Sequence, residues 1–156
     1  MRVSLASPVY NESGLIQEFI HKAVKCLRAI SDDIEIVVVN DCSTDDTLRK
    51  IKELLPVYPF IKLINLTKNS GQHIATAIAL QHTTGQYVFM MDSDMQVSPD
   101  YMVKLFEHGR NNQNWDIISA RRLSRSSNLF RNIGSYTISV FSVSYTHLTL
   151  PTKRIV

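Results

Sequence analysis

Residues 36–41 read IVVVND, and residues 87–94 read YVFMMDSD. Each stretch is an apolar run of β-forming residues that ends abruptly in polar or acidic side chains. A run of this kind indicates a buried parallel strand that opens into a loop. Ligands of open α/β sheets bind outside the carboxyl ends of such strands. Both acidic clusters are therefore candidates for a binding site.

The remainder of the chain alternates strands with helices. We expect strands at residues 2–8, 34–40, 60–66, 87–91 and 117–120. Apolar residues recur at helical spacing between them, within residues 15–27, 48–55, 74–79 and 101–108. Polar clusters at 11–13 and 43–46 are predicted to cap the first two helices. Pro8 should end the first strand's hydrogen-bond ladder because it lacks an N–H group. This order predicts the α/β class, with a mostly parallel sheet covered on both faces.

The composition is that of a globular domain. The 156 residues suffice for one domain with a real core, and 44% hydrophobic with 20% charged residues is ordinary. The net charge of +3 permits an anionic ligand or a membrane surface without requiring either, and we expect no nucleic-acid partner. Cys26 and Cys42 are interpreted as reduced thiols of a cytoplasmic protein. We find no signal peptide and no apolar run of the roughly 18 residues that a membrane helix needs.

Asp92 and Asp94 form the strongest local signal. One intervening residue, Ser93, lets both carboxylates reach a shared hard cation at the end of the apolar strand. Such a pair suits Mg²⁺ or Mn²⁺ that holds substrate phosphates. A simple capping turn is the alternative interpretation of the same triplet. The position at a strand end favours the metal, and hence a nucleoside diphosphate ligand.

Four further residues follow predicted strands and could contact a nucleotide. Tyr10 offers a ring for base stacking, and Glu12 could accept a hydrogen bond from ribose or base. Asp41 could accept N–H groups from a nucleobase edge, or it could cap the next helix. Gly71 permits close approach of the backbone at a helix N-terminus, where an anion is favoured. No glycine-rich phosphate loop is present, which disfavours a dinucleotide-binding oxidoreductase.

The C-terminal part of the sequence has a different character. Arg121, Arg122 and Arg125 follow the fifth predicted strand, and their guanidinium groups suit a phosphate, although a solvated loop is the usual explanation. Residues 144–156 show no clear period and no caps. We therefore predict one domain at residues 1–143 and a non-native or disordered tail at 144–156.

Taken together, these motifs resemble family 2 glycosyltransferases with the GT-A fold, over about residues 2–131. The family's pattern appears in four segments that follow in order: Pro8-Val9-Tyr10-Asn11-Glu12, residues 40–47 (NDCSTDDT), Asn69-Ser70-Gly71 with Ala75, and Asp92-Ser93-Asp94. The stretches Gly71-Gln72-His73 and Asp94-Met95-Gln96 are similar to those of polyprenyl-phosphate glycosyltransferases. Four motifs in order are specific, whereas each alone is not.

The resemblance implies a GT-A, Rossmann-like α/β/α sandwich and a set of nucleotide-sugar-binding residues. It places Pro8, Tyr10, Glu12 and Asp41 in the nucleoside pocket, with Gly71 and Ser93 nearby, and assigns ribose and metal-bound diphosphate to Asp92 and Asp94. Arg121, Arg122 and Arg125 would hold an acceptor phosphate.

The implied reaction is transfer of a sugar from a UDP- or GDP-linked donor to an acceptor, with polyprenyl phosphate as the leading candidate. The catalytic base stays unknown. A polysaccharide or glycan acceptor is one alternative, and a truncated donor-binding fragment without turnover is another. The full-length protein could associate with the cytoplasmic face of a membrane.

Two residues depart from the family pattern in the segment at 40–47. Asn40 stands where the family usually has an aspartate, which weakens a charge argument at that position. Cys42 stands where the family has a glycine, which is tolerable if the backbone there has a negative φ angle.

Overall fold

The computed structural model describes residues 1–111, 116–120 and 154–155. The chain divides into two compact units. One comprises residues 1–118 and 153–156, and the other comprises residues 119–152. The first unit contains the strands β1 (Val3–Val9), β2 (Ile34–Asn40), β3 (Ile61–Asn65), β4 (Tyr87–Met90) and β5 (Arg154–Ile155). Its helices are α1 (Ile16–Ile30), α2 (Thr47–Leu54), α3 (Gln72–Gln81) and α4 (Asp100–Asn111). The predicted alternation of strand and helix is therefore confirmed.

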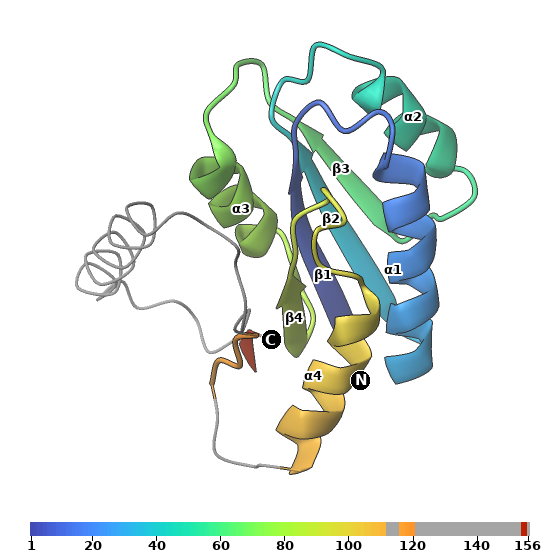
Figure 1. The fold of residues 1–156 in the computed structure, drawn as a ribbon, viewed down its shortest axis with the longest axis vertical. Helices are drawn as coiled ribbons and strands as arrows, with labels where there is room; N and C mark the ends of the chain where they lie inside the picture. The colour runs from blue at the N-terminus through green and yellow to red at the C-terminus, as the bar shows by residue number, and fades with distance from the viewer. Residues whose placement is uncertain (112–115, 121–153, 156) are drawn as a thin grey trace, which may run out of the picture. The chain divides into compact units, whose positions relative to one another are not determined.

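The strands form one sheet in the order β3-β2-β1-β4-β5, and every pair is parallel. Helices α1 and α4 pack together on one side of it and α3 lies on the other (Figure 1). All seven residues of β1 and of β2 are buried, as expected for central strands covered on both faces. The fold is thus the predicted α/β sandwich, and its carboxyl-end loops gather at one edge of the sheet.

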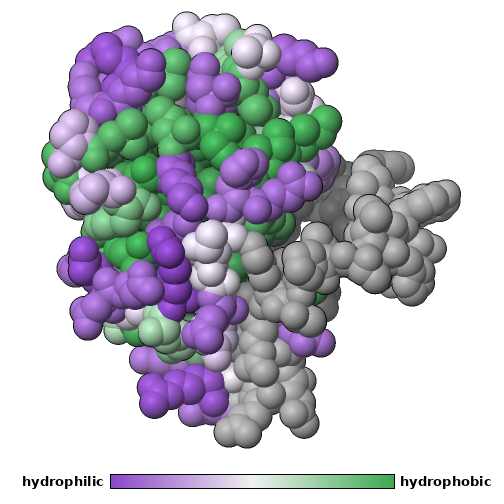
Figure 2. All heavy atoms as spheres, turned by 180° about the vertical axis from the view of Figure 1, so that it is seen from behind, coloured by the Kyte–Doolittle hydropathy of each residue, from purple (hydrophilic) through white to green (hydrophobic). Residues whose placement is uncertain are grey.

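The larger part of the core lies between the sheet and the pair α1 and α4. It contains Leu5, Phe19, Leu27 and Phe89, each at most 1% exposed. The buried cluster on the α3 side is smaller, and α3 contributes Ala75 and Ala79 to it. Hydrophobic side chains also form a band on the face seen from behind (Figure 2). Apolar atoms contribute more than half of the surface of an ordinary folded protein, so this band by itself indicates no partner.

The fifth strand differs from the prediction. Ile117 makes a single bridge, and residues 118–120 are not a strand. The short strand beside β4 is instead Arg154–Ile155, paired as Tyr87 with Arg154 and Val88 with Ile155. The apolar run at Ile117 and Ile118 is too short to specify a strand by itself, and Ile117 is 68% exposed. Most of the segment 144–156 lies outside the described residues, and its origin stays a prediction.

The predicted helix caps are mostly used elsewhere. The N-cap residues of α1 and α2 make no side-chain capping hydrogen bond. Asn11 Oδ1 accepts the Thr44 N–H at 2.8 Å, and Ser43 Oγ accepts the Asn11 N–H at 3.0 Å. The loops after β1 and β2 are neighbours because their strands pair, so these side chains join loop to loop. Asp45 comes closest to the prediction, since its Oδ1 accepts the N–H of Thr47, the first residue of α2, at 3.0 Å.

Pro8 ends one ladder but not the strand. Pairing of β1 with β4 stops at Ala6 and Met90, whereas pairing with β2 continues to Val9 and Asn40. On the β4 side, the Pro8 carbonyl accepts a hydrogen bond from the Ser93 hydroxyl at 3.4 Å. Pro8 has no N–H to continue the β4 ladder, which therefore stops at Ala6.

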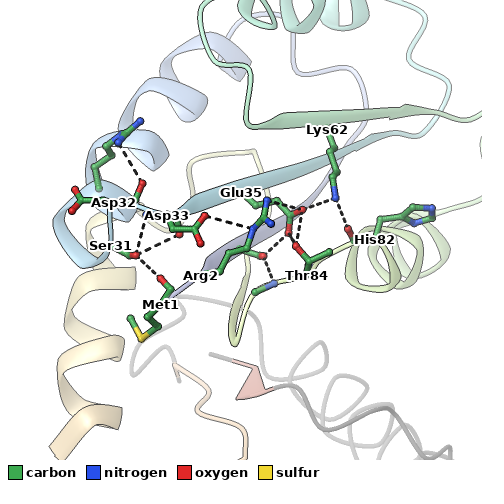
Figure 3. Close-up of polar contacts among 12 residues, drawn as sticks. Met1, Arg2, Ser31, Asp32, Asp33, Glu35, Lys62, His82 and Thr84 are labelled. Atoms are coloured by element: carbon green, nitrogen blue, oxygen red, sulfur yellow. Dashed lines mark hydrogen bonds and ion pairs between the residues drawn. The ribbon is translucent and has the colours of Figure 1, made fainter.

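A buried carboxylate joins the strands at their opposite, amino ends. Glu35 is fully buried in β2, and Lys62, Arg2 and Thr84 point toward it (Figure 3). Its oxygens accept Ser4 Oγ–H at 2.6 Å, the Thr84 N–H at 2.7 Å and Lys62 Nζ at 2.6 Å. Burial raises the pKa of Glu35, but these donors outweigh burial and lower that pKa to about 2. A charge inside an apolar strand is thus compensated by partners from β1, β3 and the loop before β4.

Candidate functional site

A pocket of about 330 Å³ opens at the carboxyl ends of β1, β2 and β4. Its lining includes all eight residues that the sequence predicted for a nucleotide-sugar site: Pro8, Tyr10, Glu12, Asp41, Gly71, Asp92, Ser93 and Asp94. Val9, Asn69 and Gln72 also line the pocket and were not predicted as site residues. Val9 and Asn69 belong to two of the motifs, and Gln72 to the Gly-Gln-His stretch, so the signal for them was present in the sequence.

Asp41 is the most enclosed acid of the site. It is 3% exposed, and its two carboxylate oxygens accept the backbone N–H groups of Ser70 at 2.7 Å and Gly71 at 2.8 Å. Gly71 has a φ of +90°, which a glycine adopts without strain. Asp41 therefore holds the loop that precedes α3. It does not cap α2, the helix that follows it in the chain. The sequence predicted an anion at the N-terminus of α3. At the N–H groups of Ser70 and Gly71, that anion is the Asp41 carboxylate of the protein itself.

Asp92, Ser93 and Asp94 differ in burial and in hydrogen-bond partners. Ser93 is buried and its hydroxyl donates to the Pro8 carbonyl, which ties the triplet to β1. Asp92 is exposed, and its Oδ1 accepts the Gln72 side-chain amide at 2.8 Å. Asp94 is half-buried, and its Oδ1 accepts the Gln96 N–H at 3.0 Å. Each aspartate thus uses one oxygen within the protein, and both line the pocket.

Glu12 adds a third acid beside this pair. Burial raises the pKa of its carboxyl group, and the negative charges of Asp94 and then Asp45 raise it further. The mouth of the pocket therefore concentrates negative charge around Asp94. A cation or a proton relieves such a concentration.

The donor set fits a hard cation that shares its coordination with a ligand. Among residues 1–111, 116–120 and 154–155, no group of three or more His, Cys, Asp or Glu side chains could hold a metal ion. The site offers the pair Asp92 and Asp94 instead. Mg²⁺ in particular is bound through one or two carboxylates plus substrate phosphates and water.

Tyr10 stands at the open side of the pocket. Its side chain follows β1, lines the pocket and is 46% exposed. Aromatic rings with one open face can stack on a planar group such as a base. The position of Tyr10 is therefore compatible with the predicted stacking role.

Three non-glycine residues near the strand ends have left-handed backbone. They are Asn11 with φ 53°, Cys42 with φ 59° and Met95 with φ 57°. They follow β1, β2 and β4 in turn, and strained positions of this kind cluster at functional sites. Cys42 does not meet the condition of a negative φ, because the tight turn after β2 bends the chain into the conformation that favours glycine.

Two further parts of the prediction concern residues that are not among those described as lining this pocket. Arg121, Arg122 and Arg125 lie outside the described residues, so their assignment to an acceptor phosphate stays a prediction. Cys26 and Cys42 are both free thiols, as expected. Within the part of the chain that the structure describes, no helix combines the length and apolar character needed to cross a bilayer.

Solved structures share this fold. A mannosyltransferase from Pyrobaculum calidifontis, in complex with GDP-Man and Mn²⁺, superposes with a TM-score of 0.62 at 25% identity, covering 77% of this chain and 35% of that one. Residues 1–349 of TarS from S. aureus, in complex with UDP-GlcNAc, give a TM-score of 0.59 at 25% identity, covering 81% and 38%. Both proteins are glycosyltransferases with the GT-A fold, so the predicted fold is confirmed.

The family follows from the sequence comparisons. The model of glycosyl transferase family 2 matches residues 4–153, and the chain belongs to this family. An undecaprenyl-phosphate 4-deoxy-4-formamido-L-arabinose transferase from Pectobacterium carotovorum is 31% identical over 140 residues, covering 88% of this chain and 42% of the relative. A protein of the same name from Klebsiella pneumoniae is 27% identical over 139 residues. This chain spans 42% of the length of each of these two relatives.

Proposed function

We propose that this chain carries the donor-binding site of a glycosyltransferase that uses a nucleoside diphosphate sugar and a divalent cation. One observation carries the proposal: Tyr10, Asp41, Asp92 and Asp94 come from three separate strand ends and line one pocket. A ring, a buried acceptor and a carboxylate pair are the groups that a base, a ribose and a metal-bound diphosphate require. Family membership and the GDP-Man and UDP-GlcNAc complexes of the structural neighbours support the same function.

Each side chain has a distinct task in this proposal. Tyr10 stacks on the base, and Asp41 accepts a base N–H group with lone pairs that Ser70 and Gly71 leave free. Uracil N3–H and guanine N1–H are both compatible donors. Glu12 accepts from the ribose, and Pro8, Gly71 and Ser93 shape the walls of the pocket. These roles leave both UDP and GDP donors open.

Asp94, assisted by Asp92, would hold Mg²⁺ or Mn²⁺ beside the diphosphate. When bound there, the cation acts as a Lewis acid that neutralises the departing diphosphate. Among the described residues, hydrogen bonds are made by Oδ1 of each aspartate, which leaves Oδ2 for this contact. The two carboxylates therefore supply the negative charge that a divalent cation requires.

For the acceptor we propose polyprenyl phosphate. The support is the name of the Pectobacterium and Klebsiella relatives, undecaprenyl-phosphate transferases with 31% and 27% identity. A phosphate acceptor already carries a negative charge and needs little help from a general base. A glycan hydroxyl acceptor would need a carboxylate base, and we assign none. An acceptor of this lipid kind would bring the whole protein to a membrane surface.

The test is calorimetric titration of the purified chain with UDP, GDP and NAD in Mn²⁺. We expect binding of UDP or GDP and no binding of NAD. If the chain bound NAD but neither UDP nor GDP, the proposal would be overturned in favour of a dinucleotide-binding protein. Assays of sugar transfer to polyprenyl phosphate and to a glycan then separate the two acceptors. Nucleotide binding without transfer to either would favour the rival function, a donor-binding fragment without turnover.

A further inference from the structure

Gln72 connects two parts of the pocket that the proposed function treats separately. It is the first residue of α3, and its side-chain Nε2 donates to Asp92 Oδ1 at 2.8 Å. Both side chains are exposed and both line the pocket. The contact therefore joins the start of α3 to the carboxyl end of β4.

The backbone at Gln72 is itself fixed from both sides. On one side, the Asp41 carboxylate accepts the N–H groups of Ser70 and Gly71. On the other, the Gln72 carbonyl accepts the Thr76 hydroxyl at 2.7 Å, and the Gly71 carbonyl accepts the Ala75 N–H at 3.1 Å. A continuous series of hydrogen bonds thus runs from Asp41 at the end of β2, through the start of α3, to Asp92.

We propose that Gln72 is a positioning residue for the cation site, which orients the Asp92 carboxylate, and that Asp41 in turn places Gln72. This inference rests on the proposed function and deepens it. An exposed carboxylate after a strand can rotate freely, and a fixed donor on Oδ1 restricts that rotation and directs Oδ2 to the pocket. Partners of this kind typically govern metal affinity about ten- to a hundredfold.

The chemistry of the amide suits this task. A lysine or arginine at the same position would hold Asp92 equally well, but its positive charge would repel the cation. The side-chain amide of Gln72 is neutral, so it orients the carboxylate without neutralising it. The nucleoside part of the ligand does not depend on this contact, whereas it does depend on Asp41.

The role of Gln72 at the cation site and the role of Asp41 at the nucleoside can therefore be measured separately. Gln72→Met removes the donor and keeps the length of the side chain. Gln81→Met at the far end of α3 is the matched control, because Gln81 is exposed and does not line the pocket. For each full-length variant, Mn²⁺ affinity is measured by water proton relaxation with saturating UDP or GDP, and nucleotide affinity is measured separately in EDTA. Circular dichroism checks the fold, and Gln72→Ala serves as a second variant.

We expect Gln72→Met to weaken Mn²⁺ binding about tenfold, the lower end of the range for such partners because the contact is exposed. Affinity for the nucleotide in EDTA should change less than about twofold, and Gln81→Met should match the wild type in both. In an Asp92→Ala background, Gln72→Met should have no further effect on Mn²⁺, which a merely structural role would not produce.

Three results would overturn the inference. Unchanged Mn²⁺ affinity in a folded Gln72→Met variant would remove the positioning role while leaving the proposed function intact. An equal loss in EDTA and in Mn²⁺ would assign Gln72 to the nucleotide or to the fold. Absence of Mn²⁺-dependent nucleotide binding in the wild type would overturn the proposed function and this inference with it.

Discussion

The carboxylate of Asp41 accepts the backbone N–H of Gly71 at 2.8 Å, although the two residues are 30 positions apart. The other oxygen accepts the N–H of Ser70. One buried side chain therefore shapes a wall of the pocket while lining that pocket itself. Any substitution of Asp41 should affect both stability and binding, and the two effects can be measured independently.

For Asp41→Asn we expect losses in both properties. The amide has one acceptor oxygen, so one backbone N–H group would face another donor. Loss of a charge-assisted hydrogen bond corresponds to about 1.5–3 kcal/mol of unfolding free energy, or to roughly ten- to a hundredfold in affinity for UMP or GMP. Urea unfolding and calorimetry measure the two quantities. Asp32→Asn, at an exposed aspartate before β2, is the control. Reduced stability with unchanged affinity would leave Asp41 as an anchor of the loop alone.

Cys42→Gly should stabilise the protein. Cys42 has a φ of 59°, and a left-handed residue with a side chain carries a strain of about 1–2 kcal/mol. The greater freedom of glycine in the unfolded chain offsets about 0.5–1 kcal/mol of this relief. We therefore expect the free energy of unfolding to rise by about 0.5–1 kcal/mol in urea titrations. Cys42→Ala keeps the Cβ atom and should show no gain. An equal gain from alanine would place the effect in the thiol and not in the backbone.

The Glu35 network should make stability depend on acid pH. The pKa of Glu35 is lowered in the folded state to about 2 from 4.5, so the folded protein binds fewer protons than the unfolded chain between these values. Its stabilising contribution is fully present above about pH 4.5 and is lost as the pH falls toward 2. The shift corresponds to about 3 kcal/mol.

The measurement is urea unfolding between pH 6 and the lowest pH at which the protein stays folded, roughly 3 for many domains. Glu35→Gln should be less stable at pH 6 and should lose less on acidification than the wild type. Glu107→Gln, at an exposed glutamate of α4, should follow the wild-type curve. Parallel curves for Glu35→Gln and wild type would show that the Glu35 carboxylate is not the group that titrates.

Gly85→Ala tests the close packing beside the same network. A Cβ atom at Gly85 would lie 2.6 Å from Ser4 Oγ, 2.8 Å from Ser4 N and 2.9 Å from the Tyr87 carbonyl oxygen. Two of these neighbours are backbone atoms that cannot move aside, so we expect a loss of about 1–3 kcal/mol in unfolding free energy. Gly14→Ala has nothing within 4 Å and should be nearly neutral. Similar stability of the two variants in thermal unfolding would contradict the packing described here.

The central strands were predictable because they are rich in apolar, β-forming residues. The sequence predicted β2 at its observed bounds, and β1 and β4 to within one residue; β1 and β2 are buried throughout, and β4 is buried at Val88 and Phe89. The fifth strand was not predictable. It consists of Arg154 and Ile155, which have no apolar run and pair with β4 across more than sixty residues.

The residues of the pocket were predictable, but their bonding was not. Motifs at strand ends identified Asp41 and Asp92, because parallel strands bring their carboxyl ends together. The partners of these acids come from α3, and no local pattern links Asp41 with Gly71 or Asp92 with Gln72. The cap predictions failed at Asn11 for the same reason, since a neighbouring loop competes for the side chain that a helix would otherwise use.

The central claim is that Asp92 and Asp94 make nucleotide binding depend on a divalent cation. Asp94→Ala is the variant, and Asp32→Ala, an exposed aspartate before β2, is the control. Calorimetry gives the affinity for UDP and GDP in Mn²⁺ and in EDTA for each protein. We predict that Mn²⁺ strengthens binding at least about tenfold in the wild type and in the control, and less than about twofold in Asp94→Ala. Equal affinities in Mn²⁺ and EDTA for the wild-type chain would contradict the account.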